Sequence, residues 1–173
     1  MTPEQLREIQ TPLKEKYRSD GDSAVATLSA SGTVDFDAIA VRLIKEEGCP
    51  SIPGLHPMAG GDGSYSCAAE MLLEALVGCA GVTLAAVCTA MAIPVESAKL
   101  VAEGDMDFRG TLGIDRETAV GFTAIRLRFE FESPAEDEKL AKAVQLAERY
   151  CVVAQSLKNI EATWTRGDGL GVG

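Results

Sequence analysis

Hydrophobic and polar residues alternate along several parts of the chain, most clearly over residues 121–132. One side of this stretch carries hydrophobic residues and the other carries charged ones: Phe122, Ile125, Leu127, Phe129 and Phe131 against Arg126, Arg128, Glu130 and Glu132. A period of two is typical of a half-buried strand. Turn residues and β-forming residues predict further strands at 24–31, 38–45, 95–103 and 160–165. We expect the first two to be joined around Gly32, and a bulge or kink at Gly104.

A different spacing predicts helices. Residues 68–92 are hydrophobic nearly all round and are closely followed by Pro94, which predicts one long buried helix. Residues 134–150 follow a Ser-Pro start signal and are expected to form a second helix. Its apolar face would carry Leu140, Val144, Ala147 and Cys151. Two Thr-Pro pairs predict short helices over 3–10 and 12–19.

This order of strands and helices predicts an α+β fold. Residues 46–66 contain three prolines and five glycines, so we expect a long loop without regular structure. No internal repeat or linker divides the chain, and residues 1–173 are expected to form one domain. Within it we predict a helical appendage at 1–21, a core at 22–165 and a flexible tail at 166–173. The apolar central helix must be covered by sheet, by other helices or by a second subunit.

The composition is that of an ordinary globular protein, with 46% hydrophobic and 24% charged residues among 173. The formal net charge is −10, so the chain lacks the basic surface expected of a nucleic-acid-binding protein. Residues 75–95 contain no charge and are long enough to cross a bilayer. They are rich in small residues, however, and Glu74 directly precedes them, which favours a helix buried in a domain. We therefore expect neither nucleic acid nor a membrane as a partner.

The five cysteines indicate the compartment and the kind of site. The first ten residues are polar and lack the apolar run of a secretory signal, so we expect a cytoplasmic protein in a reducing environment. The cysteines form no CxxC pair, and His56 is the one histidine of the sequence. Structural zinc sites need closely spaced thiolate and imidazole ligands, so we expect no metal.

Cys79 and Cys88 lie nine residues apart on the predicted central helix. Such a separation corresponds to about 13 Å along the axis and to opposite faces, which excludes a disulfide between them. Cys151 would lie at the end of the 134–150 helix, on its apolar face and directed toward the core. These cysteines are therefore either a reactive site or small buried hydrophobic residues, as free cysteines usually are.

Three motifs resemble the OsmC/Ohr family, which comprises osmotically induced proteins and organic hydroperoxide resistance proteins. EMLLEALVGCAGVTLAAV at 70–87 resembles the central helix of that family, and ERYCVVAQSL at 148–157 resembles its second cysteine segment. GLHPMAGGDGS at 54–64 resembles the preceding loop of one OsmC-like subgroup. The resemblance covers roughly residues 24–165. It implies two β-hairpin or sheet units around a long buried helix, in an intertwined homodimer.

The resemblance also implies a thiol-dependent peroxidase that reduces organic hydroperoxides in oxidative or osmotic stress. Cys79 would attack the peroxide and become a sulfenic acid, and Cys151 would condense with it to a disulfide. An external dithiol, in the family a lipoyl protein, would then reduce the disulfide. This chemistry requires no metal, haem or flavin. The alternative is an OsmC-fold protein without peroxidase activity, which binds a small apolar ligand or uses Cys79 for other thiol chemistry; a purely structural or regulatory role also stays open.

Two family features that support the thiolate differ here. The family lowers the thiol pKa with an arginine held by a glutamate, but residues 29–41 contain no arginine. Arg42 is the nearest substitute, and an exposed strand arginine is the alternative. Glu70 matches the glutamate, yet it would point away from Cys79 on a straight helix. Glu70 would therefore lie before the helix or act across the dimer, or else be a first-turn acid that favours the helix dipole.

Two further positions bear on the site. Val152 stands where the family typically has a proline close after the second cysteine. His56, in the loop before the central helix, either borders the pocket and assists the thiolate or is a hydrogen-bonded structural residue.

Overall fold

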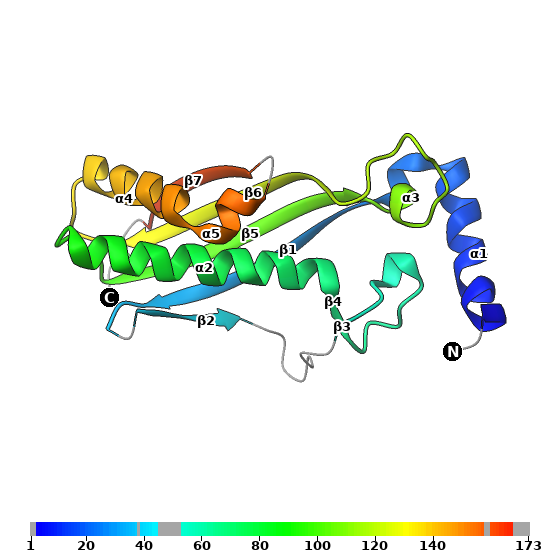
Figure 1. Ribbon diagram of the computed structural model, residues 1–173, viewed down its shortest axis with the longest axis horizontal. Coiled ribbons are helices and arrows are strands. Elements are labelled where there is room, and N and C mark those ends of the chain that lie inside the picture. Colours follow the sequence, from blue (N-terminus) through cyan, green and yellow to red (C-terminus); the bar gives the residue numbers. More distant parts are fainter. Residues whose placement is uncertain (1–2, 38, 45–52, 158–159, 168–173) are drawn as a thin grey trace, which may run out of the picture. The chain divides into compact units, whose positions relative to one another are not determined.

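A computed structural model describes residues 3–37, 39–44, 53–157 and 160–167 of the chain. A five-stranded sheet has the order β2-β1-β5-β6-β7. Its strands are β1 (Val25–Asp35), β2 (Ala40–Ile44), β5 (Ser97–Asp107), β6 (Phe122–Glu132) and β7 (Ile160–Arg166) (Figure 1). β1 and β2 are antiparallel, whereas β7 runs parallel to β6 after a helical crossover. The predicted α+β class is thus confirmed.

The helices are α1 (Pro3–Ser19), α2 (Ala68–Ala90), α3 (Phe108–Thr111), α4 (Asp137–Tyr150) and α5 (Val152–Ser156). Two 3-10 turns, η1 (Gly21–Ala24) and η2 (Pro57–Ala59), and a small parallel sheet of β3 (Pro53–Gly54) and β4 (Ser66–Cys67) complete the described elements. The predicted irregular loop at 46–66 is therefore wrong in its described part, because β3, η2 and the first residue of β4 lie in it. Residues 45–52, including Cys49, lie outside the described residues.

The chain divides into two compact units. The first unit comprises Met1–Leu28, Glu46–Met71 and Gly104–Ala124, and the second comprises Ser29–Lys45, Leu72–Glu103 and Ile125–Gly173. β1, β5, β6 and α2 contribute residues to both. That residues 1–173 act as one domain stays a prediction, and most of the predicted tail lies outside the described residues.

In the first unit, α1 is one helix rather than the two that were predicted. Pro12 lies inside it, yet residues on both sides of the proline bind the same loop. Gln10 Nε2 donates to the carbonyl of Ala59 at 2.9 Å, and the buried Tyr17 donates its hydroxyl to the carbonyl of Met58 at 3.0 Å. Packing on a common partner holds the helix continuous through the proline.

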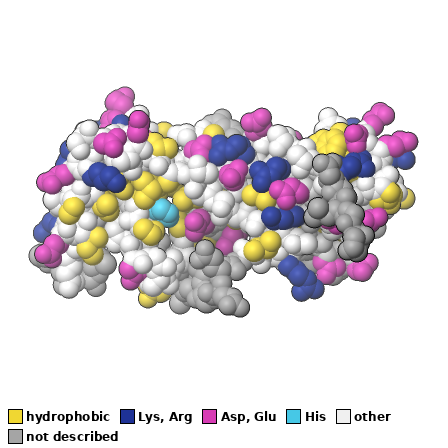
Figure 2. All heavy atoms as spheres, turned by 180° about the vertical axis from the view of Figure 1, so that it is seen from behind, with side chains coloured by type: hydrophobic (Ala, Val, Ile, Leu, Met, Phe, Trp, Pro, Cys, Tyr) yellow, Lys and Arg dark blue, Asp and Glu magenta, His cyan; other side chains and the backbone are white. Residues whose placement is uncertain are grey.

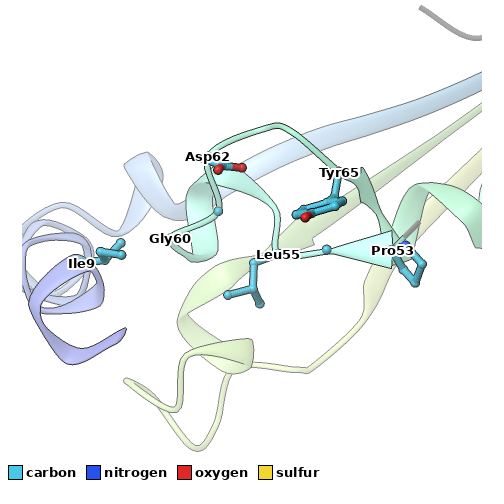
Figure 3. Close-up of a pocket in the computed structure, with 8 residues that line it drawn as sticks. Ile9, Pro53, Leu55, Gly60, Asp62 and Tyr65 are labelled. Atoms are coloured by element: carbon cyan, nitrogen blue, oxygen red, sulfur yellow. The ribbon is translucent and has the colours of Figure 1, made fainter. Parts of the chain in front are cut away.

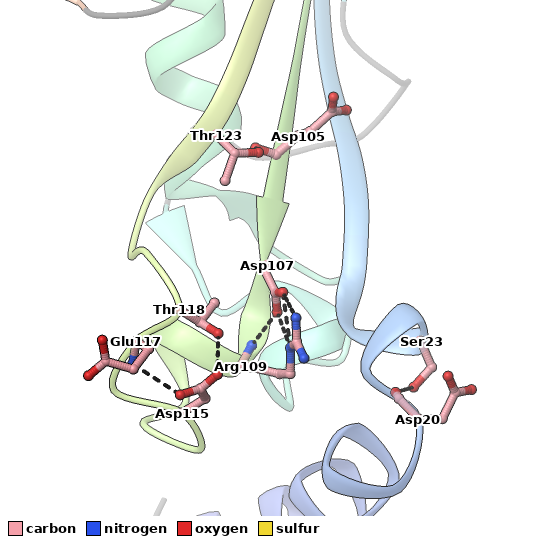
Figure 4. Close-up of polar contacts among 9 residues, drawn as sticks. All are labelled: Asp20, Ser23, Asp105, Asp107, Arg109, Asp115, Glu117, Thr118 and Thr123. Atoms are coloured by element: carbon pink, nitrogen blue, oxygen red, sulfur yellow. Dashed lines mark hydrogen bonds and ion pairs between the residues drawn. The ribbon is translucent and has the colours of Figure 1, made fainter.

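An ion pair between Asp107 and Arg109 organises the start of α3 in the first unit (Figure 4). Asp107 caps α3, because its Oδ1 accepts from the backbone N–H of Arg109 at 2.9 Å. The Arg109 side chain returns to the same carboxylate, with Nε 3.1 and 3.0 Å from its two oxygens. The hydrogen bond from Arg109 holds the pKa of Asp107 below its usual range. A Cβ on Gly21 would lie 2.6 Å from Arg109 Nη1, so η1 packs closely on the guanidinium.

Two glycines lie inside strands, contrary to prediction. The turn between β1 and β2 follows Asp35, whereas Gly32 is in the middle of β1. A Cβ on Gly32 would lie 2.8 Å from Val41 Cγ1, so the glycine permits close side-chain packing. β5 likewise continues through Gly104, whose Cβ position lies 2.5 Å from the ring of Phe122. Close approach of a neighbouring side chain, rather than a turn or kink, explains both residues.

In the second unit, α2 and α4 cover the buried face of the sheet (Figure 1). The main buried residues of that face are Ala98, Leu100, Ala102, Ile125, Leu127, Phe129 and Phe131. A Cβ on Gly81 would lie only 2.4 Å from Val41 Cγ2, so α2 lies close against the sheet. α2 is long and apolar enough to cross a membrane by length and composition. Its buried face fits the predicted core helix, and the absence of a membrane partner stays a prediction.

The start of α4 differs from the predicted 134–150. The helix begins at Asp137, because Ser133 instead forms a turn that ties the chain to the segment between α2 and β5. Its hydroxyl donates to the carbonyl of Pro94 at 2.6 Å and accepts from the backbone N–H of Ala135 at 3.0 Å. The predicted apolar face is confirmed, since Leu140, Val144, Ala147 and Cys151 are all buried.

The opposite face of the sheet carries charged residues, as the alternation over 121–132 predicted. Arg128 donates to Glu130 at 3.0 Å, and Lys99 lies 3.7 Å from the same carboxylate group. Glu103 pairs with both Arg126 and Arg128 at 3.8 Å. Figure 2 shows positive and negative side chains interspersed on this side of the molecule. Such a balanced surface is typical of a solvated sheet face.

Candidate active site

Cys79 lies in the middle of α2, where it is partly exposed. Thr83 follows one helical turn later and occupies the same face. Its hydroxyl donates to the backbone carbonyl of Cys79 at 2.8 Å. The same side chain also acts to lower the pKa of the Cys79 thiol. The helix thus places a hydroxyl beside the sulfur.

Cys151 lies at the junction of α4 and α5, and its side chain is fully buried. The chain leaves α4 there in an extended conformation, with φ −74° and ψ 111°, and starts α5 at the next residue. Cys151 is the N-cap of α5, because its Sγ accepts from the backbone N–H of Ala154 at 3.4 Å. Capping fixes the position of the sulfur and turns the first N–H groups of α5 toward the pair of cysteines.

The structure brings Cys79 and Cys151 together, and their thiols hydrogen-bond to each other. Burial acts to raise the pKa of Cys79, but hydrogen bonds outweigh it and lower the pKa from its ordinary value. The donors are the backbone N–H groups of Val153 and Val152, the Cys151 thiol and the Thr83 hydroxyl. No cationic side chain of the described residues is among these groups.

The pKa of Cys151 moves in the opposite direction. Burial raises it to about 11, and the hydrogen bond and negative charge of Cys79 add to the increase. Cys79 therefore ionises first, while Cys151 keeps its proton and donates it toward the Cys79 sulfur. A thiolate is the reactive form of cysteine, so the direction of these pKa shifts favours Cys79 over Cys151 as the more reactive thiol.

Glu70 is the third residue of α2, so the prediction that it lies before the helix is wrong. β4 leads directly into α2 at Ala68, which places Glu70 in the first turn. Here its charge favours the helix dipole, as the alternative interpretation stated. Its negative charge also acts on His56. An action on Cys79 across a dimer stays a prediction.

Arg42 lies on β2 and forms an exposed ion pair with Asp35 at 3.2 Å. Its side chain is 82% exposed. The neighbouring Val41 points toward Gly81 of α2, so Arg42 points to the other face of the strand. Within this chain the arginine is thus directed away from α2. The geometry favours the exposed strand arginine over a supporting role at Cys79.

His56 belongs to the first unit and is the N-cap of η2, where its Nδ1 accepts from the backbone N–H of Met58 at 3.1 Å. Its ring stacks on the buried Phe108, with centroids 5.0 Å apart. Burial lowers the pKa of His56, although the charge of Glu70 partly opposes the shift. These contacts fit the hydrogen-bonded structural residue, and a role at the thiolate stays a prediction.

The other described cysteines are buried. Cys88 is 2% exposed, and burial raises its pKa to about 11, so it is an unreactive packing residue. Cys67 forms the end of β4 directly before α2, as expected for a position at the helix start. In the described ranges, no cluster of three or more His, Cys, Asp and Glu residues could hold a metal ion. That the protein needs no metal or other cofactor stays a prediction.

Sequence reasoning missed Thr83 and Val153, and it noted Val152 only as a replacement for proline, without the role of its backbone N–H. A threonine four residues after a helical cysteine is a usable signal, because the two side chains share a face. The valines act through backbone N–H groups, which have no side-chain signature. They could be found only once the start of α5 was known.

Comparisons with known proteins place the chain in a family. A family model described as OsmC-like protein matches residues 61–165. No curated protein matches the chain.

Two solved structures resemble the chain in fold. An OsmC-like protein from Mycoplasma pneumoniae is 15% identical with a TM-score of 0.53, over 82% of this chain and 94% of that one. An OsmC-like hydroperoxide resistance protein from Jannaschia sp. CCS1 is 13% identical with a TM-score of 0.56, over 81% and 91%. These similarities confirm the predicted OsmC-like fold.

Proposed function

Because the chain belongs to the OsmC-like protein family, we propose that it reduces organic hydroperoxides through Cys79 and Cys151. The observation that carries this proposal is the contact of two thiols whose pKa values shift in opposite directions. The similar fold of a hydroperoxide resistance protein supports it. A lowered pKa at Cys79 favours thiol chemistry over the ligand-binding alternative, for which an apolar, raised-pKa thiol was expected. The alternative that Cys79 serves another thiol reaction is decided by the peroxide assay below.

The reaction proceeds in two steps. The Cys79 thiolate attacks one oxygen of the peroxide, the O–O bond breaks, and the alkoxide takes up a proton to leave as the alcohol. Cys79 is then a sulfenic acid. The Cys151 sulfur displaces its hydroxyl group as water, which forms the Cys79–Cys151 disulfide. An external dithiol, for which a lipoyl protein is the family's example, returns both thiols by disulfide exchange.

Apolar groups around Cys79 favour organic hydroperoxides over hydrogen peroxide. Leu72 and Val82 lie on the same side of α2 as Cys79 and are 39% and 40% exposed. The side chain of Val152, which follows Cys151, is 73% exposed. An alkyl or aryl substituent of the peroxide can pack on Val152 and on the edge of this apolar α2 surface beside Cys79, whereas hydrogen peroxide has no such group.

The exposed apolar residues of α2 also support a homodimer, whose interface would border the substrate site at Cys79. Leu72, Ala75, Val82 and Ala86 form an exposed apolar stripe along α2 at helical spacing. A second copy would cover this stripe, because an intertwined OsmC-like dimer places the two long helices together. We expect sedimentation of a dimer at micromolar concentration. Val82→Lys would dissociate it, while Gln145→Lys on the exposed side of α4 would not. A monomeric wild-type protein would refute the dimer.

Peroxide consumption tests the proposed activity. Reduced protein should consume one equivalent of cumene hydroperoxide, and do so faster than hydrogen peroxide. Cys79→Ser should abolish the reaction. Cys151→Ser should still consume one equivalent but should stop at a sulfenic acid, which dimedone traps. Equal rates with both peroxides would refute the substrate class, and no consumption would refute the activity. We place this reaction in the cytoplasm, where thiols are kept reduced.

A further inference from the structure

A pocket of about 350 Å³ lies in the first unit, between α1 and the loop that carries β3, η2 and β4 (Figure 3). It is lined by Ile9, Pro53, Gly54, Leu55, Gly60, Gly61, Asp62 and Tyr65. Most of these residues precede the part of the chain that the family model matches. The pocket is thus built largely by an N-terminal helix and loop outside that match, and it contains neither cysteine of the proposed peroxidase site.

The walls of the pocket are fixed. Two hydrogen bonds, from Gln10 and Tyr17, tie α1 to the carbonyl groups of η2 at 2.9 and 3.0 Å. Gly60 has a positive φ of 95°, and a Cβ there would lie 2.9 Å from Ile9 Cγ2. A Cβ on Gly54 would lie 2.5 Å from Tyr65 Cβ. Such close contacts hold Ile9 and Tyr65 at the pocket, which is preformed as ligand sites usually are.

The lining is apolar with one charge. Ile9, Leu55 and Tyr65 are 42%, 47% and 51% exposed, so large hydrophobic groups lie open around a hollow. Asp62 adds a carboxylate, whose Oδ1 accepts from the backbone N–H and the hydroxyl of Ser64 at 2.9 and 2.6 Å. In the described parts of the chain, Oδ2 has no hydrogen-bond donor. These bonds from Ser64 lower the pKa of Asp62, which is therefore charged at neutral pH.

We propose that this pocket binds a small aromatic amine, whose ring packs on Ile9, Leu55 and Tyr65 while its ammonium group pairs with Asp62. The volume is near the lower end of ligand pockets, about 300–1,000 Å³, which fits a molecule of one or two rings. The phenol ring of Tyr65 offers a face for stacking and for the cation. The carboxylate and the net charge of −10 select a positive group over a negative one.

Calorimetric titration of the full-length protein tests this with three indoles of similar size. Tryptamine carries an ammonium group, 3-ethylindole is neutral, and indole-3-propionate is negative. We expect tryptamine to bind up to about fivefold more tightly than 3-ethylindole, as an exposed ion pair allows, and indole-3-propionate to bind most weakly. No binding of tryptamine at millimolar concentration, or equal binding of all three, would overturn the proposal. This comparison uses only the wild-type protein, so it holds even if a variant fails to fold.

A matched pair of variants identifies the carboxylate. Asp115 resembles Asp62 in its local bonding, since it accepts from the backbone N–H of Glu117 at 3.0 Å and from the hydroxyl of Thr118 at 2.8 Å (Figure 4). It does not line the pocket. Asp62→Asn should weaken tryptamine binding about fivefold, and Asp115→Asn should leave it unchanged. An equal effect of both variants would show a general influence of charge and overturn the assignment.

Discussion

Thr83→Val tests how the pKa of Cys79 is lowered, since no cationic side chain of the described residues is among the groups that lower it. The variant keeps a branched side chain on α2 but removes the hydroxyl, which donates to the Cys79 carbonyl at 2.8 Å and acts to lower the pKa of the Cys79 thiol. Hydrogen bonds to charged groups contribute about 1.5–3 kcal/mol. Taking about 1.5 kcal/mol, the fraction of thiolate below the pKa should fall about tenfold.

The expected change in rate is smaller than the change in thiolate. A thiolate becomes more nucleophilic as its pKa rises, with a Brønsted coefficient of about 0.4–0.5. The higher nucleophilicity therefore offsets nearly half of the tenfold loss of thiolate on a logarithmic scale. The alkylation rate of Cys79 should then be about threefold to fourfold lower than in the wild type at acidic pH. At alkaline pH, where both proteins are ionised, Thr83→Val should react about threefold faster than the wild type. The two pH profiles should cross.

The assay is alkylation of Cys79 by iodoacetamide between pH 5 and 10, followed by mass spectrometry. Thr89→Val is the matched control, because Thr89 also donates to a carbonyl one turn earlier, that of Ala85 at 2.8 Å, with no cysteine there. Its profile should match that of the wild type. If the profile of Thr83→Val also matches the wild type, the hydroxyl does not support the thiolate. A uniform decrease at every pH would indicate lost packing instead.

Three further predictions concern packing and buried charge. Gly81→Ala should lower the free energy of unfolding by about 1–2 kcal/mol in urea titrations, because its methyl group would lie 2.4 Å from Val41 Cγ2. Adding Val41→Ala should recover part of this loss. If the effects of the two substitutions on the free energy of unfolding simply add, the proposed clash is refuted. Asp107→Asn should cost about 2 kcal/mol at pH 7. Since Arg109 holds the folded pKa of this carboxyl below its ordinary 3.8, the ion pair stabilises the fold above that pH, and the difference between variant and wild type should vanish as the pH falls through the folded pKa. Cys88, with a pKa of about 11, should resist iodoacetamide at pH 8 until urea unfolds the protein, and early labelling would show that it is accessible.

Much of the fold could be predicted from residue patterns. The alternation over 121–132 and the apolar run over 68–92 correspond to β6 and α2 within two residues at each end. Predictions failed where long-range contacts decide the conformation. Gly32 and Gly104 lie in strands because neighbouring side chains approach them, and Pro12 lies in a helix because both of its flanks bind one loop. Local sequence carries no sign of these contacts.

The two cysteines of the proposed site could also be named from the sequence, but their environment could not. The motifs around Cys79 and Cys151 identify both residues. That Cys79 is supported by hydrogen bonds depends on the start of α5 at Val152, a five-residue helix that no pattern predicted. Arg42 is the arginine nearest in sequence to the family's position, yet its place on the strand directs it away from α2.

Disulfide mapping after oxidation tests the central claim most directly. Reduced protein is mixed anaerobically with one equivalent of cumene hydroperoxide, alkylated, digested without reductant and analysed by mass spectrometry. We predict rapid formation of a Cys79–Cys151 peptide pair, which Cys79→Ser abolishes. Thiols that stay unmodified after minutes, or a disulfide that joins other cysteines, would contradict the proposed reaction.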